Sequence, residues 1–263
     1  YLGLNITNYS QYGSSQTDIA LTGDISATSG HALRLSTYAS EGDVGSTIKL
    51  NNVSSFYDGL YISANATQGD VTSNLDVSGT ITSEFGYGIY MMSSVSEGAS
   101  YSDIKANNIT SGYQGLYLSN FATGDVISTI SVTGDIVSGS AGAVTIQSSS
   151  DQGNVANVIN LNNLTSNADG LYIIGSTNIG TSTTDLTVSG QIKSTSSGIV
   201  LNSYVDDGNA VANFDINSVT SVYDAIYISN LVSGTDNGKS VVNVTTRGEI
   251  VSQDGYGIYT ESN

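Results

Sequence analysis

The sequence contains no cysteine, no proline and no tryptophan, and charged residues make up only 11% of its 263 positions. The lack of cysteine excludes disulfide bonds and cysteine-based zinc or redox sites. No apolar run approaches the roughly 18 residues of a membrane-spanning helix, and no signal-like segment opens the chain. We therefore expect no membrane insertion of this segment.

Basic residues are scarce as well. Six lysines and arginines stand against 23 aspartates and glutamates, which gives a net charge of −17. This charge opposes binding to phosphate backbones, so we expect no nucleic-acid partner. Glycine, serine, threonine, asparagine and tyrosine are abundant instead, and these residues favour turns and strands over helices. The composition predicts an all-β protein.

One short phrase recurs along the chain. It reads "VSSFYDGLYIS" at 53–63, "ITSGYQGLYLS" at 109–119, "LTSNADGLYII" at 164–174 and "VTSVYDAIYIS" at 219–229. The apolar residue that opens each strand of this kind defines an anchor position. The anchors are Leu4, Leu33, Leu60, Ile89, Leu116, Val144, Leu171, Ile199 (or Val200), Ile226 and Ile258.

The anchors recur about every 28 residues over about nine coils, and a fixed period of this length is typical of a repeat architecture. Alternate anchors, from Leu4 to Ile226, are separated by 56, 56, 55 and 55 residues, so the true unit is a pair of coils. Each coil holds short runs of alternating polarity, such as 60–62 and 75–77, which predict half-buried strands. Stacked coils place equivalent strands in parallel register, about 4.8 Å apart.

The two coil types differ at one corner. One type turns through glycine, as in "LDVSGTITS" (75–83), and the other through two asparagines, as in "IKLNNVSS" (48–55). The corner residues are Gly79, Gly134, Gly190, Asn52, Asn108 and Asn163. Because glycine and asparagine most readily adopt a positive φ, we expect a left-handed corner in both types, with the asparagines stacked as an amide ladder. A second glycine series marks a loop in each coil: Gly13, Gly42, Gly69, Gly98, Gly124, Gly153, Gly180, Gly208 and Gly238.

These patterns predict one continuous right-handed parallel β-helix, a β-solenoid, over residues 1–263, since the right-handed form is the commoner. The repeat is already present at Leu4 and still present at Tyr259, and no capping segment is recognisable. We therefore expect a β-helix that is uncapped at both ends. Because the first residue is Tyr1 rather than methionine, we also expect it to be part of a longer chain.

Two segments carry a resemblance to a known family, "VSGTITSEFGYGIYMMSS" (77–94) and "TTRGEIVSQDGYGIYTES" (245–262). They resemble the passenger regions of bacterial autotransporters and of filamentous-haemagglutinin-type adhesins, which repeat a similar phrase of strand, glycine-containing bend and strand. The resemblance implies a right-handed β-helix that is displayed on a bacterial cell or secreted from it. It also implies a use in attachment, in aggregation or as a stalk.

Two rows of tyrosine follow from the repeat. The first row follows the anchor: Tyr61, Tyr90, Tyr117, Tyr172, Tyr227 and Tyr259. The second lies in the adjoining bend: Tyr57, Tyr87, Tyr113, Tyr223 and Tyr256. Stacked tyrosines present an apolar, hydrogen-bonding strip that suits sugar rings or a protein surface. The alternative is that like residues stack between coils only to stabilise the strand ladder.

An acidic edge accompanies the glycine loop. Its members are Glu41, Asp43, Asp70, Glu97, Asp125, Asp151, Asp206, Asp207 and Asp236. Ca²⁺ would relieve the repulsion between such carboxylates, and its candidate ligands are Asp43, Asp70, Asp125, Asp206 and Asp207. The nonapeptide of calcium-binding solenoids is absent, however, so the competing interpretation is a solvated edge that keeps the rod soluble. We expect no other cofactor.

Some β-helices degrade polysaccharides, so an enzyme is a remote alternative. That chemistry needs clustered acids with basic or metal partners in a groove. The chain has a single histidine, His31, and its two arginines, Arg34 and Arg247, lie far apart. The remaining charges include Lys49, Asp76 and Lys105 at equivalent outward positions, where opposite signs predict support of the strand register. We expect no enzymatic activity.

The sequence thus favours a non-enzymatic bacterial β-helix, secreted or at the cell surface, that acts as an adhesin passenger or stalk and contacts a host glycan or protein. The alternative is a structural subunit that stacks end to end on identical subunits to form an extracellular filament or surface layer, with Ca²⁺ as a potential aid.

Overall fold

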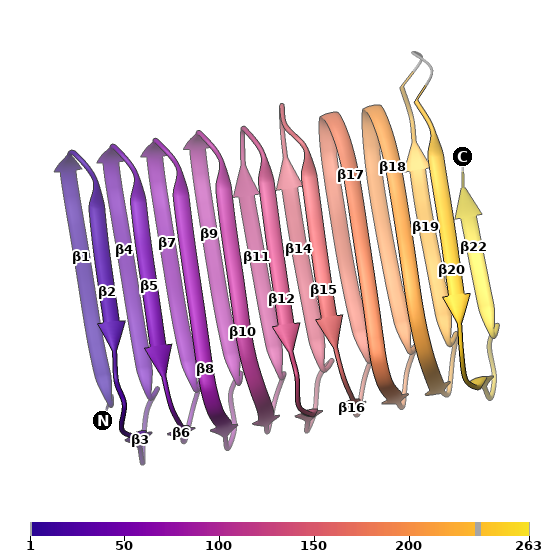
Figure 1. The fold of residues 1–263 in the computed structure, drawn as a ribbon, viewed down its shortest axis with the longest axis horizontal. Helices are drawn as coiled ribbons and strands as arrows, with labels where there is room; N and C mark the ends of the chain where they lie inside the picture. The colour runs from indigo at the N-terminus through magenta and orange to yellow at the C-terminus, as the bar shows by residue number, and fades with distance from the viewer. Residues whose placement is uncertain (1, 235–237, 263) are drawn as a thin grey trace.

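The computed structural model describes residues 2–234 and 238–262. Within these ranges the chain forms 22 strands and no helix. The strands ascend on the far side of the molecule, descend on the near side and advance from left to right with each coil (Figure 1). This winding is right-handed, so the predicted right-handed parallel β-helix is confirmed.

Each coil contributes segments to three parallel stacks. The first stack contains β1 (Leu4–Tyr12), β4 (Leu33–Glu41), β7 (Leu60–Gln68), β9 (Ile89–Glu97), β11 (Leu116–Ala122), β14 (Val144–Ser150), β19 (Ile226–Val232) and β22 (Ile258–Ser262). The second contains β2 (Ser15–Ala20), β5 (Val44–Leu50), β12 (Val126–Val132), β15 (Val155–Leu161) and β20 (Ser240–Thr246). The third contains β3 (Ile25–Ala27), β6 (Val53–Ser55), β13 (Ile136–Ser138), β16 (Leu164–Ser166) and β21 (Ile250–Ser252).

Four strands belong to more than one stack. β8 (Val71–Ser83) and β10 (Ser100–Ser111) run through the second and third stacks. β17 (Leu171–Ser194) and β18 (Ile199–Ser221) run through all three. The near side of Figure 1 is the second stack and the far side is the first.

The pairing register confirms the anchor positions. Leu4 pairs with Leu33, and the series continues without a gap to Ile258. Ile199, rather than Val200, holds this register in its coil. The two-coil repeat read from the sequence is therefore the repeat of the structure.

The apolar side chains form a continuous column through the coils. In β7 and β8, Leu60, Ile62, Leu75 and Ile81 point inward and are at most 2% exposed. Their alternation with outward polar residues follows the two-residue period of a strand. Burial of each such side chain stabilises the fold by about 1.5–3 kcal/mol relative to an exposed one.

A seam of buried polar side chains lies beside this column, and the sequence analysis did not predict it. We call it the polar seam; its members include Ser46, Ser73, Ser93, Ser102, Asn120, Ser128, Ser148, Asn157, Thr184 and Ser203. Beyond it lies a smaller apolar cluster that includes Val71, Val95 and Val126. The interior therefore consists of two apolar columns with a polar seam between them.

The polar seam is held by hydrogen bonds that run from coil to coil. Ser102 Oγ donates to Asn120 Oδ1 at 3.1 Å, and Asn120 Nδ2 donates to Ser128 Oγ at 2.8 Å. The chain continues through Ser148, whose hydroxyl lies 3.1 Å from that of Ser128 and donates to Asn157 Oδ1 at 2.7 Å. These contacts pair groups that would be costly to bury alone, and the seam still contains two buried atoms without a partner among the described residues, Asn157 Nδ2 and Thr184 Oγ1.

The glycine corners differ from the prediction of a left-handed turn. Among the described glycines, positive φ angles, from 94° to 143°, occur only in the loop series, at Gly13, Gly42, Gly69, Gly98, Gly180 and Gly208. At Gly134, a Cβ atom would instead lie 2.2 Å from Oδ1 of Asn108 in the preceding coil. That oxygen accepts a hydrogen bond from Asp135 N at 2.9 Å. Glycine is needed here for space rather than for its φ angle.

The same geometry recurs at two other corners. A Cβ atom at Gly79 would lie 2.2 Å from Asn52 Oδ1, and one at Gly190 would lie 2.2 Å from Asn163 Oδ1. The asparagines therefore do not stack on one another as an amide ladder. Each lies over the glycine corner of the next coil and accepts its backbone N–H, at 2.9 Å from Thr80 N and 2.8 Å from Gln191 N. This pairing gives a physical reason for the two-coil alternation.

Candidate functional site

The first row of tyrosines lies on the outward side of the first stack. In coil order the row reads Arg34, Tyr61, Tyr90, Tyr117, Thr145, Tyr172, Val200, Tyr227 and Tyr259. The predicted register is confirmed, but Thr145 and Val200 interrupt the row. It divides into a group of three, which we call the tyrosine strip (Tyr61, Tyr90 and Tyr117), an isolated Tyr172, and a pair at the last coils.

The rings of the tyrosine strip stack on one another. Tyr61 and Tyr90 have centroids 5.0 Å apart and planes within 6°, and Tyr90 and Tyr117 have centroids 5.0 Å apart and planes within 10°. The Arg34 guanidinium lies 5.4 Å from the Tyr61 centroid, a cation–π contact. Neighbouring rings occupy the ring faces, so the strip offers ring edges and hydroxyls to a ligand.

The bend tyrosines occupy two different positions. Tyr57, Tyr113 and Tyr223 lie three residues before their anchors, whereas Tyr87 and Tyr256 lie two residues before theirs. Tyr57 and Tyr113 are 50% and 41% exposed, and Tyr223 and Tyr256 are exposed as well. The bend residues of the N-terminal half therefore extend the aromatic surface of the strip toward solvent.

Tyr87 is the centre of this aromatic group. Its ring contacts Tyr113 edge-on at 5.0 Å, Tyr90 at 5.1 Å and Tyr117 at 5.9 Å between centroids. Burial, followed by the neighbouring Tyr113 phenol, raises the pKa of Tyr87 to about 12. Burial also raises the pKa of Tyr90, with Tyr61 as the next cause. Both phenols are therefore neutral hydrogen-bonding groups at physiological pH.

The only histidine lies at the edge of the same surface. His31 Nδ1 is 3.0 Å from Asp58 Oδ2, and its ring lies 6.0 Å from Tyr61 and 6.3 Å from Tyr57 between centroids. The other oxygen of Asp58 accepts a hydrogen bond from Tyr87 N at 2.9 Å. Asp169 and Asp224 make the same bond to the next coil, at 3.0 and 2.7 Å, so Asp58 has a structural task of its own.

Three members of the acidic edge, Asp43, Asp70 and Asp125, are such hydrogen-bond acceptors. Asp43 Oδ1 accepts from Asp70 N at 2.9 Å, and Asp70 Oδ1 accepts from Ala99 N at 2.8 Å. Asp125 Oδ1 accepts a hydrogen bond from Asn154 N at 2.7 Å, and Asn154 Oδ1 accepts one from Thr181 N at 2.9 Å. An amide and a carboxylate serve equally at this position, so its task is to fix the corner of the next coil.

The predicted calcium ligands do not form one row. Asp207 is equivalent to Ile179 rather than to Asp43, and Asp206 accepts hydrogen bonds from Tyr204 Oη at 2.7 Å and from Ser233 Oγ at 2.5 Å. These two bonds hold the pKa of Asp206 below its usual range. Asp236 lies outside the described residues. Across the described ranges, no three acidic or histidine side chains come together in a group that could hold a metal ion.

The outward side of the second stack carries a row of charges. Lys49, Asp76 and Lys105 are in register as predicted. Lys105 Nζ, however, pairs with Asp103 of its own strand at 2.9 Å, and this bond raises its pKa. The row supports the register less directly than the sequence analysis expected, because its ion pair runs along a strand rather than across strands.

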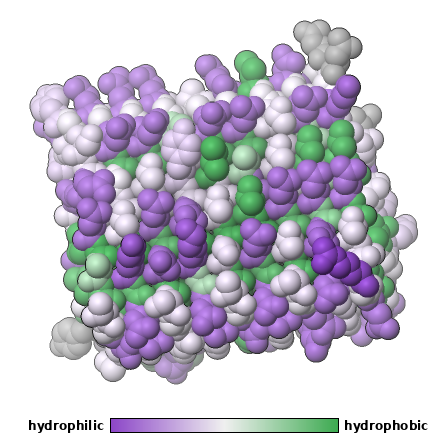
Figure 2. All heavy atoms as spheres, viewed as in Figure 1, coloured by the Kyte–Doolittle hydropathy of each residue, from purple (hydrophilic) through white to green (hydrophobic). Residues whose placement is uncertain are grey.

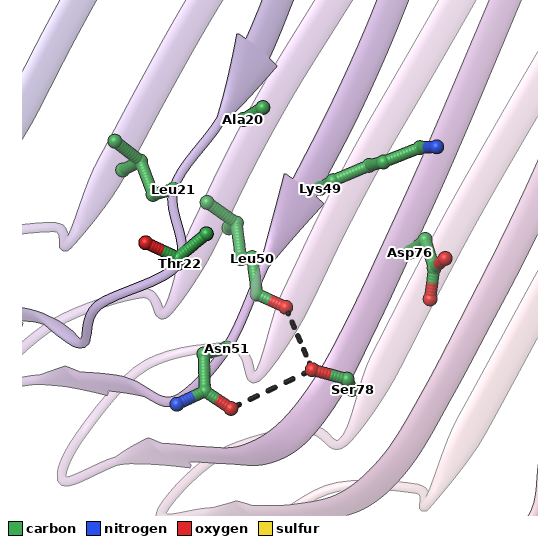
Figure 3. Close-up of a pocket in the computed structure, with 8 residues that line it drawn as sticks. All are labelled: Ala20, Leu21, Thr22, Lys49, Leu50, Asn51, Asp76 and Ser78. Atoms are coloured by element: carbon green, nitrogen blue, oxygen red, sulfur yellow. Dashed lines mark hydrogen bonds between the residues drawn. The ribbon is translucent and has the colours of Figure 1, made fainter.

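A groove of about 470 Å³ lies beside this row. Figure 3 shows Lys49 and Asp76 extending from neighbouring strands above Leu50, while Ser78 Oγ donates to the Leu50 carbonyl at 3.3 Å and lies 3.5 Å from Asn51 Oδ1. The groove contains one acid and one lysine and no histidine. It lacks the pair of carboxylates that hydrolysis of a glycosidic bond requires.

No family model, curated protein or solved structure matches this chain. The likeness to autotransporter passengers therefore stands on the sequence phrases alone. Among the described residues, no helix is long and apolar enough to span a membrane.

The two broad faces of the rod differ in charge. Figure 2 shows the second stack, where hydrophilic side chains alternate with apolar strips. The charged row of Lys49, Asp76 and Lys105 belongs to this stack. On the opposite face, β7 and β11 contain no charged residue and β9 contains only Glu97, at its end. The tyrosine strip thus lies on strands nearly free of charge in a molecule whose net charge is −17, with the Arg34 guanidinium and the Asp58 carboxylate at its edge.

Proposed function

We propose that this chain is a non-enzymatic bacterial β-helix, secreted or held at the cell surface, that acts as a stalk and presents an attachment surface on β7, β9 and β11. The observation that carries the proposal is the tyrosine strip on strands that contain no charged residue other than Glu97, in a strongly acidic rod. The resemblance of residues 77–94 and 245–262 to autotransporter passengers supports the location and the role as a stalk.

The chemistry of this surface favours an uncharged host glycan. Tyrosine hydroxyls and the serine and asparagine side chains between them donate and accept hydrogen bonds, while the exposed bend tyrosines offer apolar ring surface. A carboxylated or sulfated sugar would meet a single cation, Arg34, which already contacts Tyr61, and it would be repelled by the acidic molecule. A host protein is the other partner class, and an array of host surface proteins probed beside the glycan array tests it.

The test is a glycan array probed with the chain, followed by titration of the best ligand. Tyr57→Ala with Tyr113→Ala removes two exposed bend rings next to the strip, and we expect at least a tenfold loss of affinity. Tyr223→Ala with Tyr256→Ala is the matched control at the other end of the rod, and it should bind normally. Equal losses in both double variants, or binding only to anionic glycans or to host proteins, would refute a neutral-glycan site at the strip.

A second candidate function is end-to-end assembly into a filament or surface layer. The observation that favours it is the strand ladder itself: each coil pairs with the next through equivalent residues, as Leu4 does with Leu33 and Ile226 with Ile258, and an identical chain offers the same pairing partners. Open strand edges recruit other strands.

Electron microscopy of the isolated chain separates the two functions. The chain is imaged once with Ca²⁺ and once after chelation. Discrete rods in both conditions support the stalk and exclude the filament for this chain. Long threads of the width of one rod support assembly, and their loss on chelation would assign Ca²⁺ a part in it.

A further inference from the structure

The stacked tyrosines have a chemical consequence that does not depend on the proposed function. The tyrosine strip occupies paired positions in three successive strands, and its rings are nearly parallel with neighbouring centroids 5.0 Å apart. The near-parallel rings at this spacing place the phenols of successive strands next to one another. Two other registered pairs repeat this arrangement with centroids 5.3 Å apart: Tyr227 with Tyr259 at 6° and Tyr9 with Tyr38 at 9°.

Such pairs are placed for oxidative coupling. A one-electron oxidant removes an electron from a phenol, the hydroxyl proton passes to water, and the unpaired electron of the resulting radical spreads to the ortho carbons. Two radicals join through a new carbon–carbon bond. Each ring then loses its ortho hydrogen as a proton to water while its oxygen takes up a proton from water, which restores the aromatic system and the hydroxyl. The pair of rings has lost two electrons and two protons in total. With hydrogen peroxide as the final oxidant and a peroxidase as catalyst, these electrons and protons pass to the peroxide, which becomes two waters.

We propose that the tyrosine strip is a modification site at which adjacent coils become covalently joined by dityrosine bridges. The strand ladder holds the reacting rings in place, so coupling within the rod competes well with coupling between molecules. The rings are partly exposed, so a radical-generating oxidant can reach them. The chain has no cysteine, and a dityrosine bridge supplies the coil-to-coil cross-link that a disulfide cannot.

Tyr172 is an internal control for coupling between stacked rings. It occupies the same row, but its paired neighbours in the adjacent coils are Thr145 and Val200. It has the same backbone setting and the same outward direction as the strip, yet no phenol lies beside it in that row. Proximity in the stack therefore predicts bridges at Tyr90 and none within the molecule at Tyr172.

The experiment treats the full chain, at low concentration, with horseradish peroxidase and hydrogen peroxide. Dityrosine fluorescence is followed, and cross-linked peptides of the monomer band are mapped by mass spectrometry. We expect a mass loss of two hydrogens per bridge, with Tyr90 joined to Tyr61 or Tyr117, Tyr227 joined to Tyr259 and Tyr9 joined to Tyr38. The bridged monomer should also unfold at a higher temperature than the untreated one.

Three variants sharpen the result. Tyr90→Phe keeps an aromatic ring in the stack but removes both strip bridges, while the bridge between Tyr227 and Tyr259 remains. Tyr172→Phe should leave the pattern unchanged. Thr145→Tyr adds a ring beside Tyr117 and should create a new bridge there. Bridges found only between molecules, monomer bridges that involve Tyr172 in the natural chain, or a pattern that Tyr90→Phe leaves unaltered would overturn the proposal.

Discussion

Single side chains set the register of one coil on the next. At three corners of the coil, an oxygen of asparagine or aspartate accepts the backbone N–H of the residue in the following coil, as Asn108, Asp70 and Asp58 do at 2.9, 2.8 and 2.9 Å. Each bond spans 27 to 29 residues of sequence. A polar residue that looks like a turn former in the sequence therefore links one coil to the next. This role explains why acids are frequent although the described residues contain no acidic cluster suited to a metal ion.

Replacement of Gly134 by alanine tests the asparagine corner. The new Cβ atom would lie 2.2 Å from Asn108 Oδ1, so the bond to Asp135 N must break or the corner must move. We expect a loss of about 1–3 kcal/mol in the free energy of unfolding, measured by denaturant titration. Gly23 is the equivalent residue of the first coil, and a Cβ atom at that position would meet nothing within 4 Å, so Gly23→Ala should change stability little. Equal effects of the two variants would contradict this account.

Two replacements of Asp70 separate the structural role of the acidic edge from a metal-binding role. Asn154 shows that an amide serves at this position, so Asp70→Asn should retain the bond to Ala99 N and the stability of the natural chain. Asp70→Ala should lower the free energy of unfolding by about 1 kcal/mol, because the N–H of Ala99 loses its acceptor. Thermal unfolding with and without Ca²⁺ is the readout. A calcium-dependent stabilisation that Asp70→Asn removes would instead identify Asp70 as a metal ligand.

Tyr87 predicts how the protein responds to alkali. Its pKa is raised from 10.0 to about 12, mainly by burial, so the folded state favours the neutral phenol. The stabilisation is therefore complete below pH 10 and is lost as the pH rises toward 12. In Tyr87→Phe the ring remains but does not ionise, so the fall of the thermal midpoint between these pH values should be smaller. Tyr172→Phe, at a tyrosine without a stacked tyrosine neighbour, is the control, and an equal change in both variants would exclude Tyr87 as the source.

At the scale of elements, the strands show how far sequence patterns reach. Period-two alternation of large apolar residues located every anchor and its strand, because Leu60 or Ile89 can only point inward. The sequence analysis placed short strands of about three residues, whereas β4, β7 and β9 each have nine. Their second halves alternate between small or polar inward residues and polar outward ones, so no hydrophobic signal marks them. The polar seam was missed for the same reason.

The corners show a second limit. Their glycines were recognised, but the reason for them lies in the preceding coil. Asn52 lies 27 residues before Gly79, and no local rule links the two. The first tyrosine row was predicted in the correct register because it repeats with the anchors, whereas the bend tyrosines occupy two positions. The division of the first row by Thr145 and Val200 was visible in the sequence, once the register of each coil was known.

Asn120 tests what the polar seam contributes. It is 1% exposed, accepts from Ser102 at 3.1 Å and donates to Ser128 at 2.8 Å, so it joins three strands inside the rod. Asn120→Ala leaves both hydroxyls without this partner, and we expect a loss of about 2–3 kcal/mol in the free energy of unfolding. Ser119→Ala, at the neighbouring outward position, is the control and should cost less than about 0.5 kcal/mol. A small effect of Asn120→Ala would mean that the seam is dispensable for stability.

At the scale of the whole molecule, the rod is a stack in which each coil contacts only its neighbours, so local defects and local charges add along its length. Its net charge of −17 acts against this stacking. Equivalent carboxylates in adjacent coils are about 4.8 Å apart in backbone spacing, well within the Debye length of about 10 Å at 0.1 M salt. Repulsion between coils therefore persists at moderate ionic strength and weakens only as salt is added.

This repulsion predicts that salt stabilises the rod in a way that distinguishes screening from binding. We expect the thermal midpoint to rise with NaCl, because screening removes repulsion that the unfolded chain can relieve by expanding. The described acids form no group suited to a metal ion, and several already accept backbone hydrogen bonds, so CaCl₂ at equal ionic strength should raise the midpoint by a similar amount. The measurement is differential scanning calorimetry in matched NaCl and CaCl₂ series. A larger rise in CaCl₂ that saturates at low concentration would require a specific calcium site, and its loss in Asp43→Asn would place that site on the acidic edge.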